Sequence, residues 1–347
     1  MLTTLSNNQC AWLRGGESAD VVLNSQVGFA RNIAGYPFLS RADDRVIARI
    51  EELVRNNIMD IKVGEDVEYH RLDEMDSVTR DLLVERQLIG GEYAEADWPR
   101  GIAYSGDESV SIRVNEEDHL RIQVLHGGVD LRKAWEKARE TDERLAARIP
   151  YAFSSQYGYL TACPTNVGTG MHASVVVHLP AMGLAKEMDK IIQLCNDNCC
   201  DVQGLYGDGS YASADVYRLS NQVTLGKREQ DILDDMLDIL DRIIGFERKA
   251  RRVFSTRDGE HLRGRVMRAI TMLRSAAELS CEESLNLLSQ VRMGIEVGEL
   301  EEVGEDEINQ LLLLTLPAHL QTMDNRMSGR NELKKIRAEY LKKALAK

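Results

Sequence analysis

The change in hydrophobic pattern near Lys227 is the feature of this 347-residue sequence that most constrains its fold. Before it, segments with β-branched or alternating apolar residues predict strands, and amphipathic segments between them predict helices. The strands do not alternate regularly with helices. We therefore predict an α+β fold with a largely antiparallel sheet flanked by helices. The predicted strands are 109–114, 120–125, 158–162 and 173–179, and the predicted helices are 43–56, 131–149 and 182–196.

After Lys227 every periodic segment is helical. The turn-rich stretch 255–259 (STRDG) predicts a linker, which gives two domains, residues 1–252 and residues 260–347. The second domain is either a self-association or regulatory module, or a packed continuation of the first. Its predicted helices are 231–253, which leads into it, and 261–279, 282–292, 305–314 and 331–347.

Composition narrows the class of protein. With 43% hydrophobic residues the chain can bury a large core, and its formal net charge of −13 argues against a nucleic-acid-binding surface. No run approaches eighteen apolar residues, and the first residues lack the basic-then-apolar layout of a signal peptide. We expect a cytoplasmic protein with neither membrane nor nucleic acid as a partner.

The six cysteines do not predict a metal site. Cys195, Cys199 and Cys200 are close in sequence, but zinc sites need CxxC-type units and a second ligand pair, which the spacing does not provide. They end an amphipathic segment, where small buried thiols are common.

An acidic motif, residues 115–121 (NEEDHLR), joins two predicted strands. Clustered carboxylates beside an arginine can hold a cation, bind a guanidinium or act as a base. A metalloenzyme built on this motif has little support, because the histidines and cysteines lack metal-ligand spacing.

Four further segments, taken in order with the acidic motif, make the chain resemble the ATP:guanidino phosphotransferases, and most closely their bacterial protein arginine kinase branch. The stretches CPTNVGTG and SNQVTLGK carry the resemblance to that branch. The four segments are 30–38 (ARNIAGYPF), 159–170 (YLTACPTNVGTG), 204–210 (GLYGDGS) and 219–226 (LSNQVTLG).

The resemblance implies transfer of the γ-phosphoryl group of ATP, with Mg²⁺, to arginine side chains of proteins. A carboxylate grips the guanidinium and accepts its proton. The matching positions imply Glu117 as base, Cys163 as the reactive cysteine, and Asp208 where the family has a second glutamate.

The same resemblance places the nucleotide site, where the family uses a cage of five arginines. Arg121 keeps one of them; Gln26, Gly28, His172 and Gln203 replace the other four, and Gln87 replaces a histidine that stacks on adenine. Arg86, Arg113 and Lys227 are candidates to replace the lost arginines in binding phosphate. The segments that the resemblance assigns to nucleotide binding are Asn24, Ser25, Gln26, Val27, Gly28; Gln87; Arg121; His172, Ala173, Ser174, Val175, Val176; and Gln203, Gly204, Leu205, Tyr206, Gly207.

Two hypotheses follow. The favoured one is a catalytically impaired relative that acts as a binding or regulatory partner; the alternative is an active kinase with a rearranged phosphate cage. The family's phosphoarginine-reading motif matches residues 333–338 only at Arg337 and Ala338. The resemblance also implies a homodimer through the helical domain and a zinc-binding activator protein as a partner.

Overall fold

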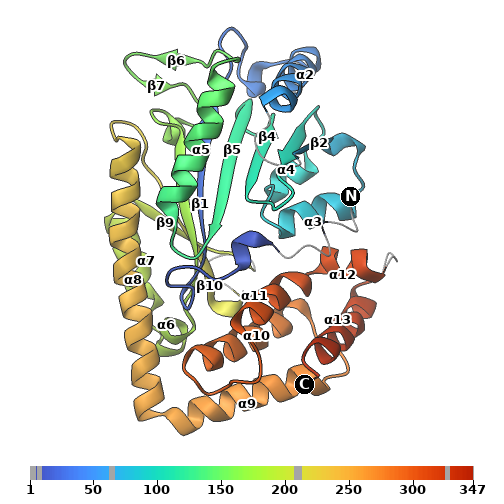
Figure 1. Ribbon diagram of the computed structural model, residues 1–347, viewed down its shortest axis with the longest axis vertical. Coiled ribbons are helices and arrows are strands. Elements are labelled where there is room, and N and C mark those ends of the chain that lie inside the picture. Colours follow the sequence, from blue (N-terminus) through green and yellow to red (C-terminus); the bar gives the residue numbers. More distant parts are fainter. Residues whose placement is uncertain (1–4, 6–9, 62–66, 207–212, 325–328, 347) are drawn as a thin grey trace.

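An eight-stranded antiparallel sheet forms the centre of the molecule (Figure 1). The computed structural model describes residues 5, 10–61, 67–206, 213–324 and 329–346. It confirms the predicted α+β class with a helical C-terminal region. In sheet order the strands are β2 (Glu68–Arg71), β3 (Gly101–Tyr104), β4 (Val110–Val114), β5 (Leu120–Gly127), β1 (Val22–Arg31), β8 (Met171–His178), β10 (Val216–Asn221) and β9 (Cys200–Gly204).

Helices cover one face of the sheet and continue into a C-terminal helical region. Of the predicted helices, the one at 305–314 matches α11 at both ends. The helices are α2 (Asp44–Ile61), α3 (Ser77–Glu85), α4 (Gly91–Glu95), α5 (Leu131–Ala146), α6 (Pro180–Ala185), α7 (Met188–Asp197), α8 (Glu229–Arg257), α9 (Gly259–Ser275), α10 (Cys281–Glu296), α11 (Glu305–Leu314), α12 (Pro317–Asp324) and α13 (Arg330–Ala344).

The structure corrects three predicted boundaries. The helix predicted at 182–196 is two helices, α6 and α7, because Lys186 adopts a left-handed conformation (φ 55°) that ends the first. The predicted linker 255–259 is largely helical, since α8 continues to Arg257 and α9 begins at Gly259. The strand predicted at 158–162 shrinks to β7 (Gly158–Tyr159), which pairs with β6 (Phe153–Ser154) in a separate hairpin.

The two faces of the sheet differ in chemistry because successive side chains of a strand point to opposite sides. Val27 and Phe29 of β1 lie in an apolar core with α2, α5 and α8. Gln26 and Gly28 alternate with them and belong to the other face, where Gln26 is opposite Ser174 and Gly28 is opposite His172. We call this second surface the polar face.

The helical region buries its apolar side chains against one end of the polar face. Leu23, Leu125 and Val176 of the sheet share a core with α9, α10, α11 and α13. Above them, α12 packs against α3. The helical region is therefore in contact with the sheet itself and not only joined to it by α8.

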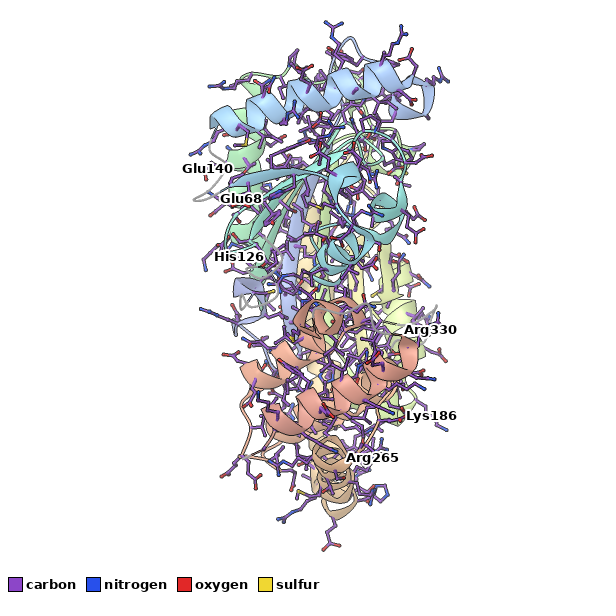
Figure 2. All side chains as sticks on the ribbon, turned by 90° about the vertical axis from the view of Figure 1, so that its right-hand side faces the viewer. Glu68, His126, Glu140, Lys186, Arg265 and Arg330 are labelled. Atoms are coloured by element: carbon purple, nitrogen blue, oxygen red, sulfur yellow. The ribbon has the colours of Figure 1, made fainter. Side chains whose placement is uncertain are left out.

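Charged side chains lie on several parts of the surface. Glu140, Lys186 and Arg330 lie exposed on separate elements (Figure 2). Within the described residues, no helix combines the length and the apolar character needed to cross a bilayer.

Arg292 of α10 connects the helical region to the start of the chain. Its side chain is fully buried and donates to the backbone oxygens of Ala19 (2.6 Å) and Asp20 (3.0 Å). It also donates to Asn309 Oδ1 (2.8 Å) and Glu305 Oε1 (2.8 Å). A buried guanidinium with this many acceptors fixes the geometry of the junction.

We expect Arg292→Leu to lower the free energy of unfolding by about 3 kcal/mol, because it leaves buried acceptors without a donor. Urea denaturation measures the change. Arg263→Leu is the matched control: Arg263 is 71% exposed with its nearest carboxylate 3.9 Å away, and it should change stability by less than about 0.5 kcal/mol. Equal stability of the two variants would contradict this role.

Candidate active site

The acidic loop between β4 and β5 is held rigidly by its first residue. Asn115 adopts a left-handed conformation (φ 62°), which asparagine tolerates better than most residues. Its side chain donates to the backbone oxygens of Ile47 (3.0 Å) and Pro99 (2.9 Å), and its own backbone oxygen accepts from Trp98 Nε1 (2.8 Å). The carboxylates that follow therefore start from a fixed backbone.

Asp118 ties this loop to two other segments. Its buried carboxylate accepts from the backbone N–H of Ala162 (2.6 Å) and from the amide of Asn32. Asn32 in turn accepts from the backbone N–H of His119 (3.0 Å), so the segment 30–38 positions the acidic loop. Because Ala162 precedes Cys163, the same carboxylate sets the position of the thiol.

Glu117 and Cys163 meet as a result. The Cys163 thiol is half-buried, 2.9 Å from Thr165 Oγ1, and lies within hydrogen-bonding reach of the exposed Glu117 carboxylate. Partial burial, followed by the charge of the neighbouring Asp118, raises the pKa of Glu117. The structure thus brings together two of the three predicted catalytic residues. The third, Asp208, lies with Gly207 outside the described residues.

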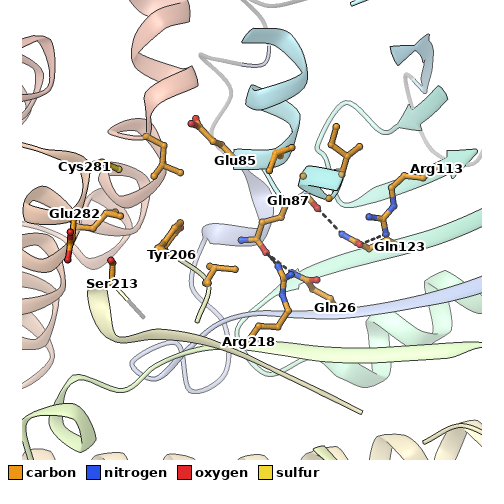
Figure 3. Close-up of a pocket in the computed structure, with 17 residues that line it drawn as sticks. Gln26, Glu85, Gln87, Arg113, Gln123, Tyr206, Ser213, Arg218, Cys281 and Glu282 are labelled. Carbon is orange, nitrogen blue, oxygen red and sulfur yellow. Dashed lines mark hydrogen bonds between the residues drawn. The ribbon is translucent and has the colours of Figure 1, made fainter. Parts of the chain in front are cut away.

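On the polar face, three glutamines and an arginine form one connected network (Figure 3). Gln87 Oε1 accepts from Gln26 Nε2 (2.7 Å) and from Arg218 Nη2 (3.0 Å). The backbone oxygen of Gln87 accepts from Gln123 Nε2 (3.0 Å). Gln26 and Gln87, both predicted at the nucleotide site, therefore contact each other directly.

Two further arginines lie beside this network and share one carboxylate. Arg113 and Arg121 are cross-strand partners. Glu116 Oε1 lies 3.2 Å from Arg113 Nη1, and Glu116 Oε2 lies 3.7 Å from Arg121 Nε. Arg113 also donates to Gln123 (2.9 Å), whereas its Nε, like that of Arg218, has no partner among the described residues.

His172 carries no charge in this setting. Desolvation, followed by three neighbouring guanidinium groups, lowers the pKa of its side chain to about 3. A histidine at this position therefore does not replace the positive charge that an arginine would supply.

Arg218 was not predicted from the sequence. It lies on β10 directly opposite Gln203 of β9. A guanidinium is therefore present on the strand next to one of the positions where the family has an arginine. Gln203 itself is exposed and donates to Asp201 Oδ2 (2.8 Å). Of the three candidates to take over, only Arg113 belongs to the polar face. Arg86 pairs with buried Glu108, and Lys227 pairs with Asp235.

The remaining residues predicted at the nucleotide site divide between the two faces. Leu205 and Tyr206 line a cavity, together with Gln26 and Gln87. Ser174 lies 3.4 Å from Gln26 on the polar face. The others serve packing or backbone roles: Val27, Ala173 and Val175 are in the core, Val176 packs toward the helical region, Ser25 donates to the oxygen of Gly128, Asn24 accepts from Gln26, and Gly204 ends β9.

The cavity, about 720 Å³, lies between the polar face and the helical region (Figure 3). Arg113 and Arg218 line its sheet side, and Cys281, Glu282 and Leu285 of α10 line the opposite side. Its size suits a small-molecule ligand. The described residues contain no group of three or more His, Cys, Asp or Glu that could hold a metal ion. The cavity fits a nucleotide in volume, but the phosphate positions do not fit the arginine cage that the resemblance implies.

We expect the ring of His172 to stay neutral between about pH 5 and pH 8, because desolvation and nearby cations oppose its protonation. The Cε1–H resonance, assigned with a His172→Gln variant, should not shift over that range in an NMR titration. A titration midpoint above pH 5 would contradict the electrostatics described for the polar face.

Comparisons with known proteins identify the family of the chain. Residues 49–250 match the ATP:guanido phosphotransferase C-terminal catalytic domain, and residues 259–347 match the protein-arginine kinase McsB C-terminal domain. The chain is 38% identical to a protein-arginine kinase of Halothermothrix orenii over 98% of both chains. It is also 34% identical to one of Bacillus cereus, over 96% of this chain and 95% of that protein.

Solved structures show the same fold. The duplicated taurocyamine kinase of Schistosoma mansoni, with bound transition-state analogue components, matches with a TM-score of 0.61 and 25% identity over 72% of this chain and 36% of that chain. Lombricine kinase matches with a TM-score of 0.58 and 23% identity, over 70% of each chain. The chain belongs to the protein-arginine kinase family of ATP:guanido phosphotransferases.

Proposed function

We propose that this chain binds arginine side chains of proteins through Glu117 and Cys163, that its phosphoryl transfer from ATP is impaired, and that it acts as a binding or regulatory partner. One contrast carries the proposal. The Glu117 carboxylate lies within hydrogen-bonding reach of the Cys163 thiol, whereas the four lost arginine positions hold Gln26, Gly28, His172 and Gln203.

The guanidinium-binding half has what it needs. A carboxylate accepts paired hydrogen bonds from a planar guanidinium. Glu117 is exposed, so an incoming side chain can reach it, while Asp118 holds the adjacent thiol loop in place.

The phosphate half lacks four of the arginines that the family resemblance implies, and at Gly28 the loss is built into the backbone. A Cβ at Gly28 would stand 2.4 Å from the backbone oxygen of Ile122, so strands β1 and β5 would have to separate to admit an arginine. His172 is neutral, and Gln26 offers no permanent charge. One arginine finger contributes about 10³–10⁵ in rate, so even a discounted loss costs several powers of ten.

A second candidate function is an active protein arginine kinase that uses ATP and Mg²⁺ with a rearranged cage. The observation that favours it is the presence of Arg113, Arg121 and Arg218 together on the polar face. Against it, Arg113 and Arg121 already share Glu116, and Arg218 is held by Gln87. A phosphate would have to compete with these partners.

The proposal includes the organisation of the chain. Residues 1–252 would form the guanidino-kinase-like domain, and residues 260–347 a regulatory and dimerisation domain. A cytoplasmic homodimer that meets a zinc-binding activator protein is the corresponding assembly. The helix α10 forms the wall of the cavity opposite Arg218. Contact between the helical domain and the cavity supports a regulatory role for that domain.

Arginine binding is testable with two matched peptides, one with arginine and one with citrulline, which lacks the charge. We expect the chain to bind the arginine peptide, and Glu117→Gln to weaken binding at least about tenfold, because a charged hydrogen bond is lost. Because the pKa of Glu117 is raised, binding should weaken as the pH falls, beginning at a higher pH than for an ordinary glutamate of pKa about 4.3.

Isothermal titration calorimetry at several pH values measures both effects. Glu140→Gln, which changes an exposed carboxylate on α5, is the matched control and should leave binding unchanged. Equal affinity for the two peptides, or a Glu117→Gln variant that binds as well as the unmodified chain, would refute arginine recognition.

A further inference from the structure

Exposed apolar side chains concentrate around the loop that carries Cys163. Nine large apolar residues of the described chain are exposed, and four of them lie on two short segments, 153–157 and 223–225. The other five are scattered over α2, α8 and α9. We call the four the apolar rim: Phe153 (62% exposed), Tyr157 (49%), Val223 (37%) and Leu225 (52%).

The first segment of the rim is fixed to the Cys163 loop by the β6–β7 hairpin. Tyr159 of β7 donates its backbone N–H to the oxygen of Gly168 (2.8 Å). Its ring contacts Phe153 edge to face, with the centroids 5.3 Å apart. Beneath it, the buried guanidinium of Arg31 lies 3.6 Å from the centroid of the same ring and pairs with Asp142. The hairpin therefore presents Phe153 from a firm base.

The second segment is fixed to the other side of the same loop. Thr224 Oγ1 lies 2.7 Å from the backbone oxygens of both Thr165 and Val167, which share its one O–H donor. A Cβ at Gly168 would stand 2.9 Å from the Cα of Leu225, so the two backbones are in contact. Thr165 also contacts the Cys163 thiol. The segment 223–225 is therefore linked to the proposed arginine site through Thr165.

We propose that the apolar rim binds an aliphatic or aromatic side chain next to the arginine in an extended segment of a partner protein. This inference rests on the proposed arginine binding and adds its sequence preference. Burial of an exposed aromatic or leucine side chain against an apolar group of the partner lowers the free energy of the complex.

The test compares two peptides in calorimetric titrations with the full chain. One is acetyl-Gly-Ser-Leu-Arg-Phe-Ser-Gly-amide, and the other replaces its leucine and phenylalanine with serine. We expect the apolar peptide to bind about tenfold more tightly, the gain from burying one such side chain. In Phe153→Ser/Leu225→Ser the ratio of the two affinities should fall to about one.

Phe246→Ser/Met272→Ser is the matched control, because these residues are 38% and 50% exposed on helices away from the rim. It should keep the tenfold ratio. Tyr157→Ser/Val223→Ser is a second rim variant and should reduce the ratio of the two affinities in part. It keeps the test informative if the first rim variant does not fold.

Equal affinity of the unmodified chain for the two peptides would overturn the rim proposal and leave arginine binding standing. A ratio that survives in both rim variants would also overturn it. If neither peptide binds at millimolar concentration, the proposed arginine binding fails, and the rim proposal fails with it.

Discussion

The buried carboxylate of Asp118 is the interaction on which the candidate site depends. It joins the acidic loop to Asn32 at the end of β1 and to the backbone just before Cys163. Burial raises the pKa of Asp118, and the hydrogen bonds from Ala162 and Asn32 oppose that rise by stabilising the charged form. Three segments distant in the sequence are therefore positioned by one side chain. The adjacency of Glu117 and Cys163 follows from it.

The two halves of the site differ in their charged groups. The guanidinium half keeps its anionic group at an exposed position. The phosphate half has three guanidinium groups on the polar face, but they lie beside Glu116 and Gln87, and desolvation together with these cations keeps His172 neutral. Glu282 of α10 faces the same cavity, so any ligand there would sense the helical region as well as the sheet. This contrast is the ground for the proposed role in binding.

Sequence patterns predicted the fold class and singled out the acidic loop, and the family resemblance named Glu117 and Cys163 as site residues without predicting that they lie near each other. They missed β1, because its polar-face residues, among them Gln26, interrupt the apolar pattern that marks a strand. They also missed Arg218, since its proximity to Gln203 is a matter of strand register, which no local pattern specifies. The break at Lys186 needs a left-handed residue that is not glycine, and local propensity does not signal it.

The proposed function requires that arginine recognition persists while phosphoryl transfer is impaired. The most direct measurement is mass spectrometry without acid treatment, on an arginine-rich protein incubated with the chain and Mg·ATP, beside Glu117→Gln and Arg218→Gln. We expect no phosphoarginine above the level of the Glu117→Gln sample. Phosphoarginine that forms with the unmodified chain and disappears in both variants would contradict it, and would show that Arg218 helps to rebuild the cage.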